Sequence, residues 1–294
     1  MRDPRLYQIA TLALLLGYGL LRLGFDVPAL HVVLILSTAL LAQLAFTRAF
    51  GLPRFDPRSA LISGLSLCLL LRTGSPWLAV IAALVTIASK FLIRWKGKHI
   101  FNPTNFGLVA MMSLTGSAWV SPGQWGHSVL FAFLMACLGG LVVYRAWRGD
   151  VTAAFLASYA AVLLGRALWL GDPLSIPIHQ LQSGALLLFS FFMLSDPKTT
   201  PDSRGARVLF AMLVAVGAWY VQFRLFRPSG ILWSLAVCSV AVPILDRLLP
   251  ARRYDWTVKG ALNDAQVDLR SGDAAPGRRS EGRLRLLRLL RGQG

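Results

Sequence analysis

The chain has 294 residues, 55% of them hydrophobic, yet its formal net charge is +17 at pH 7. Only 15% of the residues are charged, against about 25% in a typical soluble domain, which excludes an ordinary soluble enzyme, a disordered chain and a disulfide scaffold. Cys68, Cys137 and Cys238 are far apart inside apolar stretches. Their spacing does not suit a metal or redox centre, so no metal site is expected.

Apolar runs follow one another along the chain as far as residue 245. Most have the length of about 17–25 residues that crosses a bilayer, and three are shorter and begin or end at Gly, Pro or Ser. The first run follows a basic start without a cleavage site of small residues, which predicts an uncleaved span. We expect an all-α integral membrane protein with about ten transmembrane helices, at residues 6–23, 28–47, 59–71, 75–93, 104–115, 126–144, 152–170, 183–195, 207–223 and 228–245.

The basic residues separate by side when ten spans are assumed. With a cytoplasmic amino terminus, inner segments such as 48–58 and 90–98 are rich in Lys and Arg, whereas the outer loops are poor in them. This bias follows the positive-inside rule. It predicts a multi-pass protein of the inner (plasma) membrane of a bacterium, with both termini in the cytoplasm.

The chain is expected to divide into a membrane domain, residues 1–245, and a basic, mostly disordered cytoplasmic tail, residues 246–294. The segment 282–292 alternates Arg and Leu, which fits either an amphipathic helix on anionic inner-leaflet lipids or a solvated end. Because membrane orientation accounts for most of the cations, no nucleic-acid partner is expected.

A weak internal repeat links the two halves of the membrane domain, about 1–120 and 121–245. The segment that begins at Ser63-Gly64 resembles the one that begins at Ser183-Gly184. Five spans separate the two segments, so the repeats are expected to have opposite orientations. Inverted repeats with short, broken helices place a binding site near the membrane midplane, although Gly and Ser also simply permit close helix packing.

The apolar runs contain hydroxyl groups but no Asp or Glu. Ion pumps usually place carboxylates inside the membrane, so the chain alone is a poor candidate for one. Hydroxyls suit a neutral or planar ligand better than a bare ion. No catalytic constellation of hydrolysis or phosphoryl transfer occurs, and no catalytic residue is expected.

The densest polar segment, residues 90–107, leads four cations into an Asn-Pro-Thr-Asn helix start. The side chains of Asn102, Thr104 and Asn105 fit ligand contacts at a helix amino terminus, or plain N-caps. Phe101 and Trp95 offer aromatic faces on which a planar ring could stack.

These residues carry a family resemblance. Phe101-Asn102-Pro103 with Gly107 resembles an element of two integral-membrane proteins, RnfD of the Rnf electron-transport complex and NqrB of the sodium-translocating NADH:quinone reductase, which together give the NqrB/RnfD family its name. Phe192-Met-Leu-Ser-Asp196-Pro-Lys-Thr199, with the following Arg-Gly, and Val242-Pro-Ile-Leu-Asp246 are similar to further family elements. The resemblance implies ten helices in two inverted, urea-transporter-like halves and flavin-dependent electron transfer.

The loop between the fifth and sixth runs departs from that family. Family members carry FMN esterified to a Thr in a long outer loop, whereas this loop, residues 116–126, is short and lacks the attachment motif. The resemblance thus implies a short-loop, stand-alone form similar to the UnbU proteins of enediyne clusters. Covalent FMN is not expected, and a non-covalent riboflavin, FMN or quinone is left open.

The leading hypothesis is a membrane electron-transfer protein, acting with other membrane redox subunits in an ion-translocating type of oxidoreductase. Whether the chain itself acts as an enzyme is left open. The alternatives are a transporter or channel for a small neutral solute, and a scaffold that binds partners through its tail. The residues predicted to orient a ligand are Phe101, Asn102, Thr104, Asn105, Ser63, Gly64, Ser183, Gly184, Asp196 and Thr199.

Overall fold

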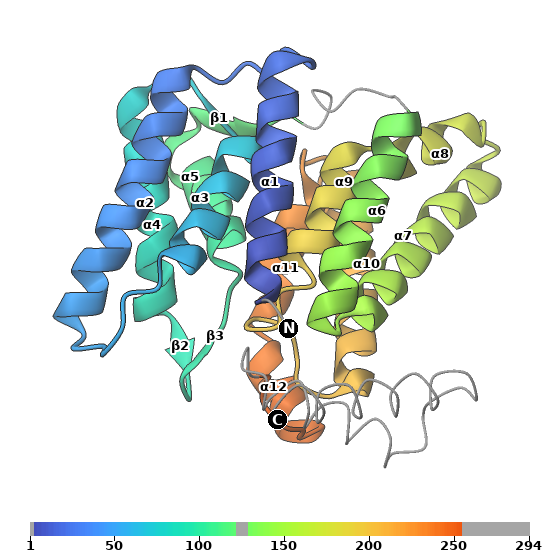
Figure 1. The fold of residues 1–294 in the computed structure, drawn as a ribbon. Coiled ribbons are helices and arrows are strands. Elements are labelled where there is room, and N and C mark those ends of the chain that lie inside the picture. Colours follow the sequence, from blue (N-terminus) through green and yellow to red (C-terminus); the bar gives the residue numbers. More distant parts are fainter. Residues whose placement is uncertain (1–2, 122–128, 255–294) are drawn as a thin grey trace, which may run out of the picture. The chain divides into compact units, whose positions relative to one another are not determined.

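The computed structural model describes residues 3–121 and 129–254. Its main compact unit, residues 4–252, consists mostly of helices (Figure 1). Nearly all of the predicted tail lies outside the described residues. The helices are α1 (Pro4–Leu21), α2 (Ala29–Ala49), α3 (Pro57–Leu70), α4 (Pro76–Leu92), α5 (Pro103–Thr115), α6 (Val129–Ala146), α7 (Gly149–Leu170), α8 (Ser175–Leu181), α9 (Gly184–Leu188), the π-helix η2 (Phe189–Met193), α10 (Arg204–Phe223), α11 (Gly230–Ser239) and α12 (Val242–Leu248).

A helix occupies each predicted apolar run, with three additions. The run 183–195 is α9 continued by η2, and the run 228–245 is broken into α11 and α12. The short helix α8 was not expected. The expectation of purely helical structure is corrected by two antiparallel ladders of two strands each, β1 (Leu71–Thr73) with β4 (Ala118–Val120) and β2 (Arg94–Trp95) with β3 (Lys98–His99).

Local sequence signals set several helix boundaries. Asp56 and Asn102 precede Pro57 and Pro103, and each caps its helix by accepting a backbone N–H, from Arg58 and Asn105 respectively. Proline at the first helical position loses no hydrogen bond, because that N–H has no partner in the helix. The same helix α5 ends at Gly116, which adopts the left-handed conformation that glycine tolerates best.

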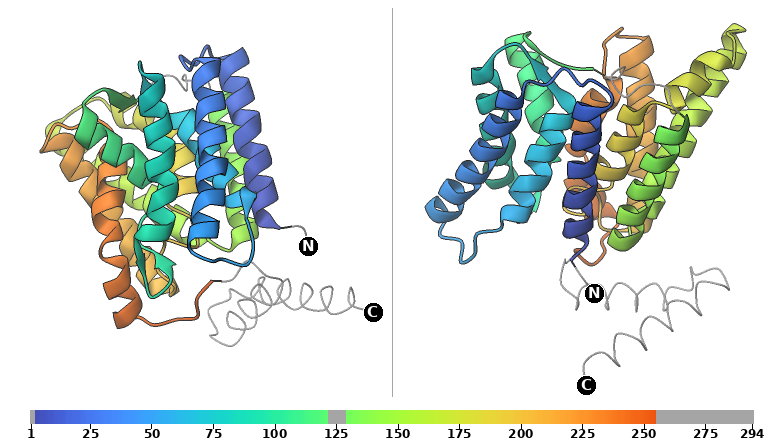
Figure 2. Two further views of the ribbon diagram at one scale, coloured as in Figure 1. Left: turned by 90° about the vertical axis from the view of Figure 1, so that its left-hand side faces the viewer. Right: turned by 45° about the horizontal axis from the view of Figure 1, so that its top comes forward.

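Consecutive long helices run in alternating directions along a common axis (Figures 1 and 2). We call the end at which α1 begins and α2 ends the basic end, because Arg5, Arg48, Arg58, Arg148 and Arg204 all lie at helix boundaries there. The helices α1 and α6 run in opposite directions, as do α3 and the α9–η2 segment. This reversal is the relation expected of inverted repeats.

The contacts between helices match in the two halves. In the first half α2 and α5 both pack on α4, and in the second half α7 and α11 both pack on α10. The halves meet where α1 contacts α6 and where α5 contacts α11. The α4–α5 contact places Gly107 against the Thr86 hydroxyl, and the α10–α11 contact places Gly217 against the Ser234 hydroxyl.

Three helices of the described part of the chain, α2, α7 and α10, are long and apolar enough to cross a membrane. The number rises to five if the bent pairs α8 with α9–η2, and α11 with α12, each count as one span. Shorter apolar helices lie at 5–21, 57–70 and 76–92. The coarse prediction of a helical membrane protein is therefore confirmed.

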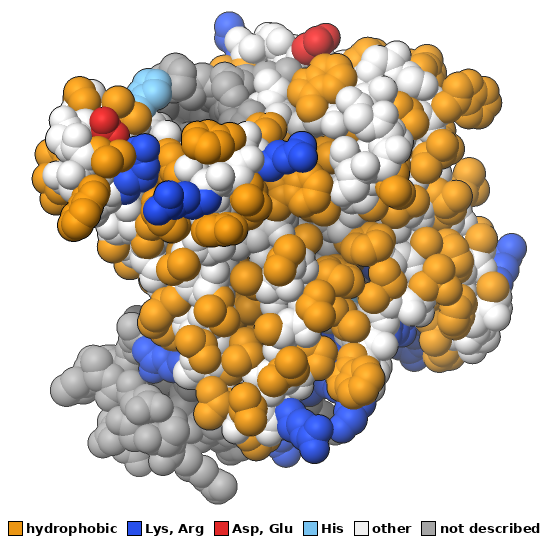
Figure 3. All heavy atoms as spheres, turned by 180° about the vertical axis from the view of Figure 1, so that it is seen from behind, with side chains coloured by type: hydrophobic (Ala, Val, Ile, Leu, Met, Phe, Trp, Pro, Cys, Tyr) orange, Lys and Arg blue, Asp and Glu red, His pale blue; other side chains and the backbone are white. Residues whose placement is uncertain are grey.

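The surface of these helices is apolar (Figure 3). Leu41 is 66% exposed, Trp169 is 89% exposed and Val237 is 71% exposed, whereas polar side chains such as Asn105 and Ser190 are fully buried. Water would penalise such a surface and lipid does not, so this distribution supports insertion in a bilayer.

Candidate functional site

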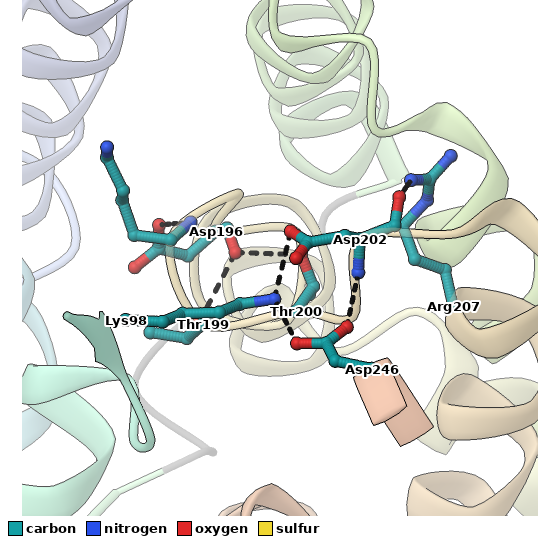
Figure 4. Close-up of polar contacts among 8 residues, drawn as sticks. Lys98, Asp196, Thr199, Thr200, Asp202, Arg207 and Asp246 are labelled. Carbon is teal, nitrogen blue, oxygen red and sulfur yellow. Dashed lines mark hydrogen bonds and ion pairs between the residues drawn. The ribbon is translucent and has the colours of Figure 1, made fainter. Parts of the chain in front are cut away.

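The segment after η2 folds into a tight turn around Asp196 near the basic end. The Asp196 carbonyl accepts hydrogen bonds from the hydroxyls of Thr199 and Thr200, at 3.3 and 3.0 Å, and from both of their backbone N–H groups at 3.1 Å. The Asp196 carboxylate accepts the Lys198 N–H at 3.0 Å (Figure 4). The predicted residue Thr199 thus shapes the backbone that presents Asp196.

The start of α5 joins this turn to three other elements. The Asn102 amide donates to the Met193 carbonyl at 3.3 Å and to the Asp196 carboxylate at 3.4 Å. The Thr104 hydroxyl donates to the Ser63 carbonyl at 3.4 Å. Asn105 donates to the carbonyl of Leu232, in α11, at 3.1 Å. Five predicted residues, Ser63, Asn102, Thr104, Asn105 and Asp196, are therefore linked in one buried polar network, which we call the α5 network.

The other predicted residues lie around this network or away from it. The rings of Phe101 and Phe106 contact each other, with centroids 5.1 Å apart. At Gly64 a Cβ atom would meet a Leu36 methyl at 3.0 Å, so this glycine permits close packing of α3 on α2. Ser183 and Gly184 lie at the opposite end of the α9–η2 segment from Asp196, and the Ser183 side chain makes no capping hydrogen bond. The structure does not bring that pair to the α5 network.

Some buried polar atoms near the start of α5 have no hydrogen-bond partner among the described residues. They include Oδ1 of Asn105, whose residue is 0% exposed, and Nδ1 of His99. Both atoms can accept a hydrogen bond. Because burying an acceptor without a donor costs free energy, such atoms mark places where a donor group would bind favourably.

The charged groups at the basic end form a second buried arrangement that the sequence did not predict. Lys98 Nζ lies 2.7 Å from Asp246 Oδ2 and 3.0 Å from Asp202 Oδ1, and the three side chains are 8, 19 and 9% exposed (Figure 4). The Asp202 N–H donates to Asp246 at 2.8 Å. Arg207 pairs with Asp150 at 2.6 Å and donates to the Asp202 carbonyl at 2.7 Å. We call Lys98, Asp202 and Asp246 the ion triad; it joins the β2–β3 hairpin to the second half of the chain.

Burial also shifts the pKa values of groups outside the helices. Burial raises the pKa of Asp196, although the Lys198 N–H and the Lys90, Lys198 and Arg148 cations act in the opposite direction. Burial together with the Arg94, Lys90 and Lys198 cations lowers the pKa of His99 to about 3. His99 is therefore neutral at physiological pH and keeps a lone pair as an acceptor.

The pKa of His99 predicts a pH-dependent stability. The unfolded chain binds a proton on His99 below its ordinary pKa of 6.5 and the folded chain does not until about pH 3. We expect His99 to lower the free energy of unfolding by up to about 1.4 kcal/mol for each pH unit between these two values, and to have no effect above pH 6.5.

Thermal unfolding of the detergent-solubilised protein at pH 7.5, 6.5 and 5.5 measures this effect. The variant His99→Gln should lose less stability on acidification than the unmodified chain. Asp196, whose raised pKa acts in the opposite direction, is present in both proteins and cancels in the comparison. Parallel pH profiles for the two proteins would contradict the assignment of a neutral His99.

Comparison with known proteins gives the geometry a context. The model of the NQR2, RnfD, RnfE family matches residues 113–255. The RnfD protein of an ion-translocating oxidoreductase complex from Halorhodospira halophila is 25% identical over 80% of this chain and 86% of its own length. The protein of the same name from Alcanivorax borkumensis is 24% identical over 76% of this chain and 84% of its own length. A local match to that from Sodalis glossinidius reaches 32% identity over 40% of this chain and 34% of the relative. These matches confirm the family resemblance that the sequence motifs carry, and the chain is a relative of the NQR2, RnfD and RnfE proteins.

Proposed function

We propose that the chain is an integral-membrane, electron-transferring subunit of a complex of the ion-translocating oxidoreductase type. The observation that carries this proposal is the match to RnfD proteins along most of the chain, 80% in the Halorhodospira halophila relative. The alternative of a transporter for a neutral solute is not favoured by these relatives. The other subunits of such a complex would be its partners.

The proposal includes a topology of ten spans in two inverted halves, about 1–120 and 121–245, followed by a cytoplasmic tail. The alternating helix directions support it, as do the matched packing on α4 and α10 and the contact of each half with the other through α1–α6 and α5–α11. The cations at the basic end support a cytoplasmic location for that end, and hence for both termini.

A non-covalent flavin or quinone is the proposed redox group, held at the α5 network. The orphan acceptors Oδ1 of Asn105 and Nδ1 of His99 fit a group that carries N–H or O–H donors, as an isoalloxazine or a quinol does. Phe101 adds an aromatic face for the ring. Such a group supplies electron transfer that no side chain of the protein provides. Asn105 and His99 would orient it, while Asn102 and Asp196 hold the start of α5 in place.

The visible absorption spectrum of the purified protein tests this proposal. A flavin gives a band near ~450 nm that disappears on chemical reduction, a property of the cofactor itself. Acid precipitation should release the flavin into the supernatant, since a covalent link is not expected; flavin retained on the pellet would contradict that point. If the protein is colourless, folded and free of extractable quinone, the redox proposal fails.

Two matched variants test the site. Asn105→Leu removes the orphan acceptor of the α5 network, and we expect the amount of flavin or quinone per chain to fall several-fold. Gln43→Leu is the control, because Gln43 also has a buried oxygen without a partner, but in α2 and outside the network. Equal loss in both variants, or in neither, would place the redox group elsewhere.

A further inference from the structure

The β2–β3 hairpin is a preorganised projection at the basic end. Arg94 pairs with His99 and Trp95 pairs with Lys98. The two residues between the strands, Lys96 and Gly97, have φ values of 47° and 80°. Two consecutive residues with positive φ form the tight type I′ turn that matches the twist of a hairpin. Because Lys98 is held in the ion triad, the hairpin has a fixed base and presents Arg94, Trp95 and Lys96 outward.

An aromatic cluster supports one of these cations. The Phe91 ring stacks on Phe46, with centroids 5.2 Å apart, and contacts Phe50 at 5.6 Å. The Arg94 guanidinium lies 5.4 Å from the centroid of Phe91 and donates to the Lys90 carbonyl. These contacts restrict the side chain, so Arg94 would lose little conformational entropy on binding an anion.

The surrounding surface mixes exposed cations with exposed apolar groups. Phe50 is 51% exposed, Leu92 is 65% exposed and Trp95 is 55% exposed. Lys and Arg atoms gather beside hydrophobic atoms along the lower edge of the molecule in Figure 3. We call this surface the basic corner; it consists of Arg48, Phe50, Leu52, Arg54, Leu92, Arg94, Trp95 and Lys96, all of them exposed.

The basic corner lies at the level of a membrane interface. Trp77, at the other end of α4, is 77% exposed. The 17 residues of α4 between the two Trp positions span about 25 Å at 1.5 Å per residue, close to the thickness of a bilayer's hydrocarbon core of about 30 Å. Exposed Trp residues at both ends of a span are typical of the two interfaces. The cations beside Trp95 are then at the depth of the lipid headgroups.

We propose that the basic corner binds an anionic phospholipid. Arg94 and Lys96 contact the headgroup phosphate, Arg48 adds a third cation from the end of α2, and Phe50 and Leu92 pack against the acyl chains. The lipid is a specific ligand of this corner, distinct from the diffuse attraction of the tail to the membrane. The site does not depend on the redox group; only its assignment to the inner leaflet rests on the proposed topology.

Native mass spectrometry of the full chain tests the site with phosphatidylglycerol as the probe and phosphatidylcholine as the neutral reference. We expect phosphatidylglycerol to bind more tightly than phosphatidylcholine, and the double variant Arg94→Gln, Lys96→Gln to weaken its binding roughly tenfold, because each cation near a lipid surface contributes substantially to attraction. The control is Arg224→Gln, Arg227→Gln, which removes two exposed cations from the opposite end of α10 and should keep the affinity.

Further arms make each outcome decisive. Equal binding of the two lipids, or an equal loss in both double variants, overturns the proposal. Competition by millimolar inorganic phosphate would show that the corner binds free phosphate and not lipid, and competition by an acidic peptide alone would indicate a protein partner; either result overturns it. If the double variant does not fold, Arg48→Gln with Arg54→Gln takes its place. The spectrum of the purified protein is unaffected by these variants, so failure here is distinguishable from failure of the redox proposal.

Discussion

Replacing Lys98 with Met is expected to destabilise the protein by about 3–5 kcal/mol, because it leaves two buried carboxylates without their cation. Asp202 and Asp246 both lie within 3.0 Å of Lys98 Nζ and are at most 19% exposed. Two like charges at that depth repel each other and have lost most of their hydration. Chemical or thermal unfolding in detergent, followed by the fluorescence of the Trp residues, measures the loss.

A rescue variant distinguishes loss of the ion triad from a general packing defect. Adding Asp202→Asn and Asp246→Asn to Lys98→Met removes the uncompensated charges and should restore most of the lost stability. The control is Asp172→Asn, which breaks the Arg166–Asp172 pair, whose side chains are 33 and 37% exposed. Such a pair contributes about 1 kcal/mol or less. An effect of Lys98→Met as small as that of the control would show that the triad does not stabilise the fold.

Gly107→Ala is expected to destabilise the protein by about 1–3 kcal/mol through overpacking. The added Cβ would overlap the Thr86 hydroxyl and would lie 3.1 Å from Thr86 Cβ and 3.3 Å from the Ala82 carbonyl oxygen. This loss must exceed the gain of up to about 1 kcal/mol that Ala normally brings to a helix interior. The unfolding temperature of the variant in detergent measures the net effect.

The Thr86 side chain provides the matched suppressor. Its hydroxyl has no hydrogen-bond partner among the described residues, so Thr86→Ala alone should cost little. Combined with Gly107→Ala it removes the overlapping atom and should recover most of the stability. Gly165→Ala, in α7, is the neutral control because no atom lies within 4 Å of its added Cβ. A Gly107→Ala protein as stable as Gly165→Ala would contradict the close α4–α5 contact.

The long apolar helices could be predicted because hydropathy and boundary residues agree. The run 59–71 became α3 because Asp56 and Pro57 supply a cap and a first helical residue. Hydropathy carries no information on backbone angles, however, so the break between α11 and α12 within a continuous apolar run was missed. Strands of two or three residues are too short to show a periodic pattern. The π-helix η2 also has no distinct sequence signature.

The candidate site could be predicted only in part for a similar reason. Asn102, Thr104 and Asp196 stand out as polar residues next to prolines in a hydrophobic chain, and the structure links them. The pairing of Lys98 with Asp246 joins residues 148 positions apart, and only the tertiary fold brings them together. The similarity between Ser63-Gly64 and Ser183-Gly184 reflects equivalent places in two halves that face opposite ways, which is why the second pair lies far from the network.

The packing of each half mainly on itself has a consequence for biosynthesis. The contacts of α2 and α5 with α4 join helices that are close in sequence, so the first half can fold in the membrane while the second is still being translated. The bonds from Lys98 to Asp202 and Asp246 must form afterwards, once α10 and α12 have been inserted. We expect the docking of the two halves to be the slow step of assembly, with the basic residues of the hairpin held in water until their acidic partners arrive.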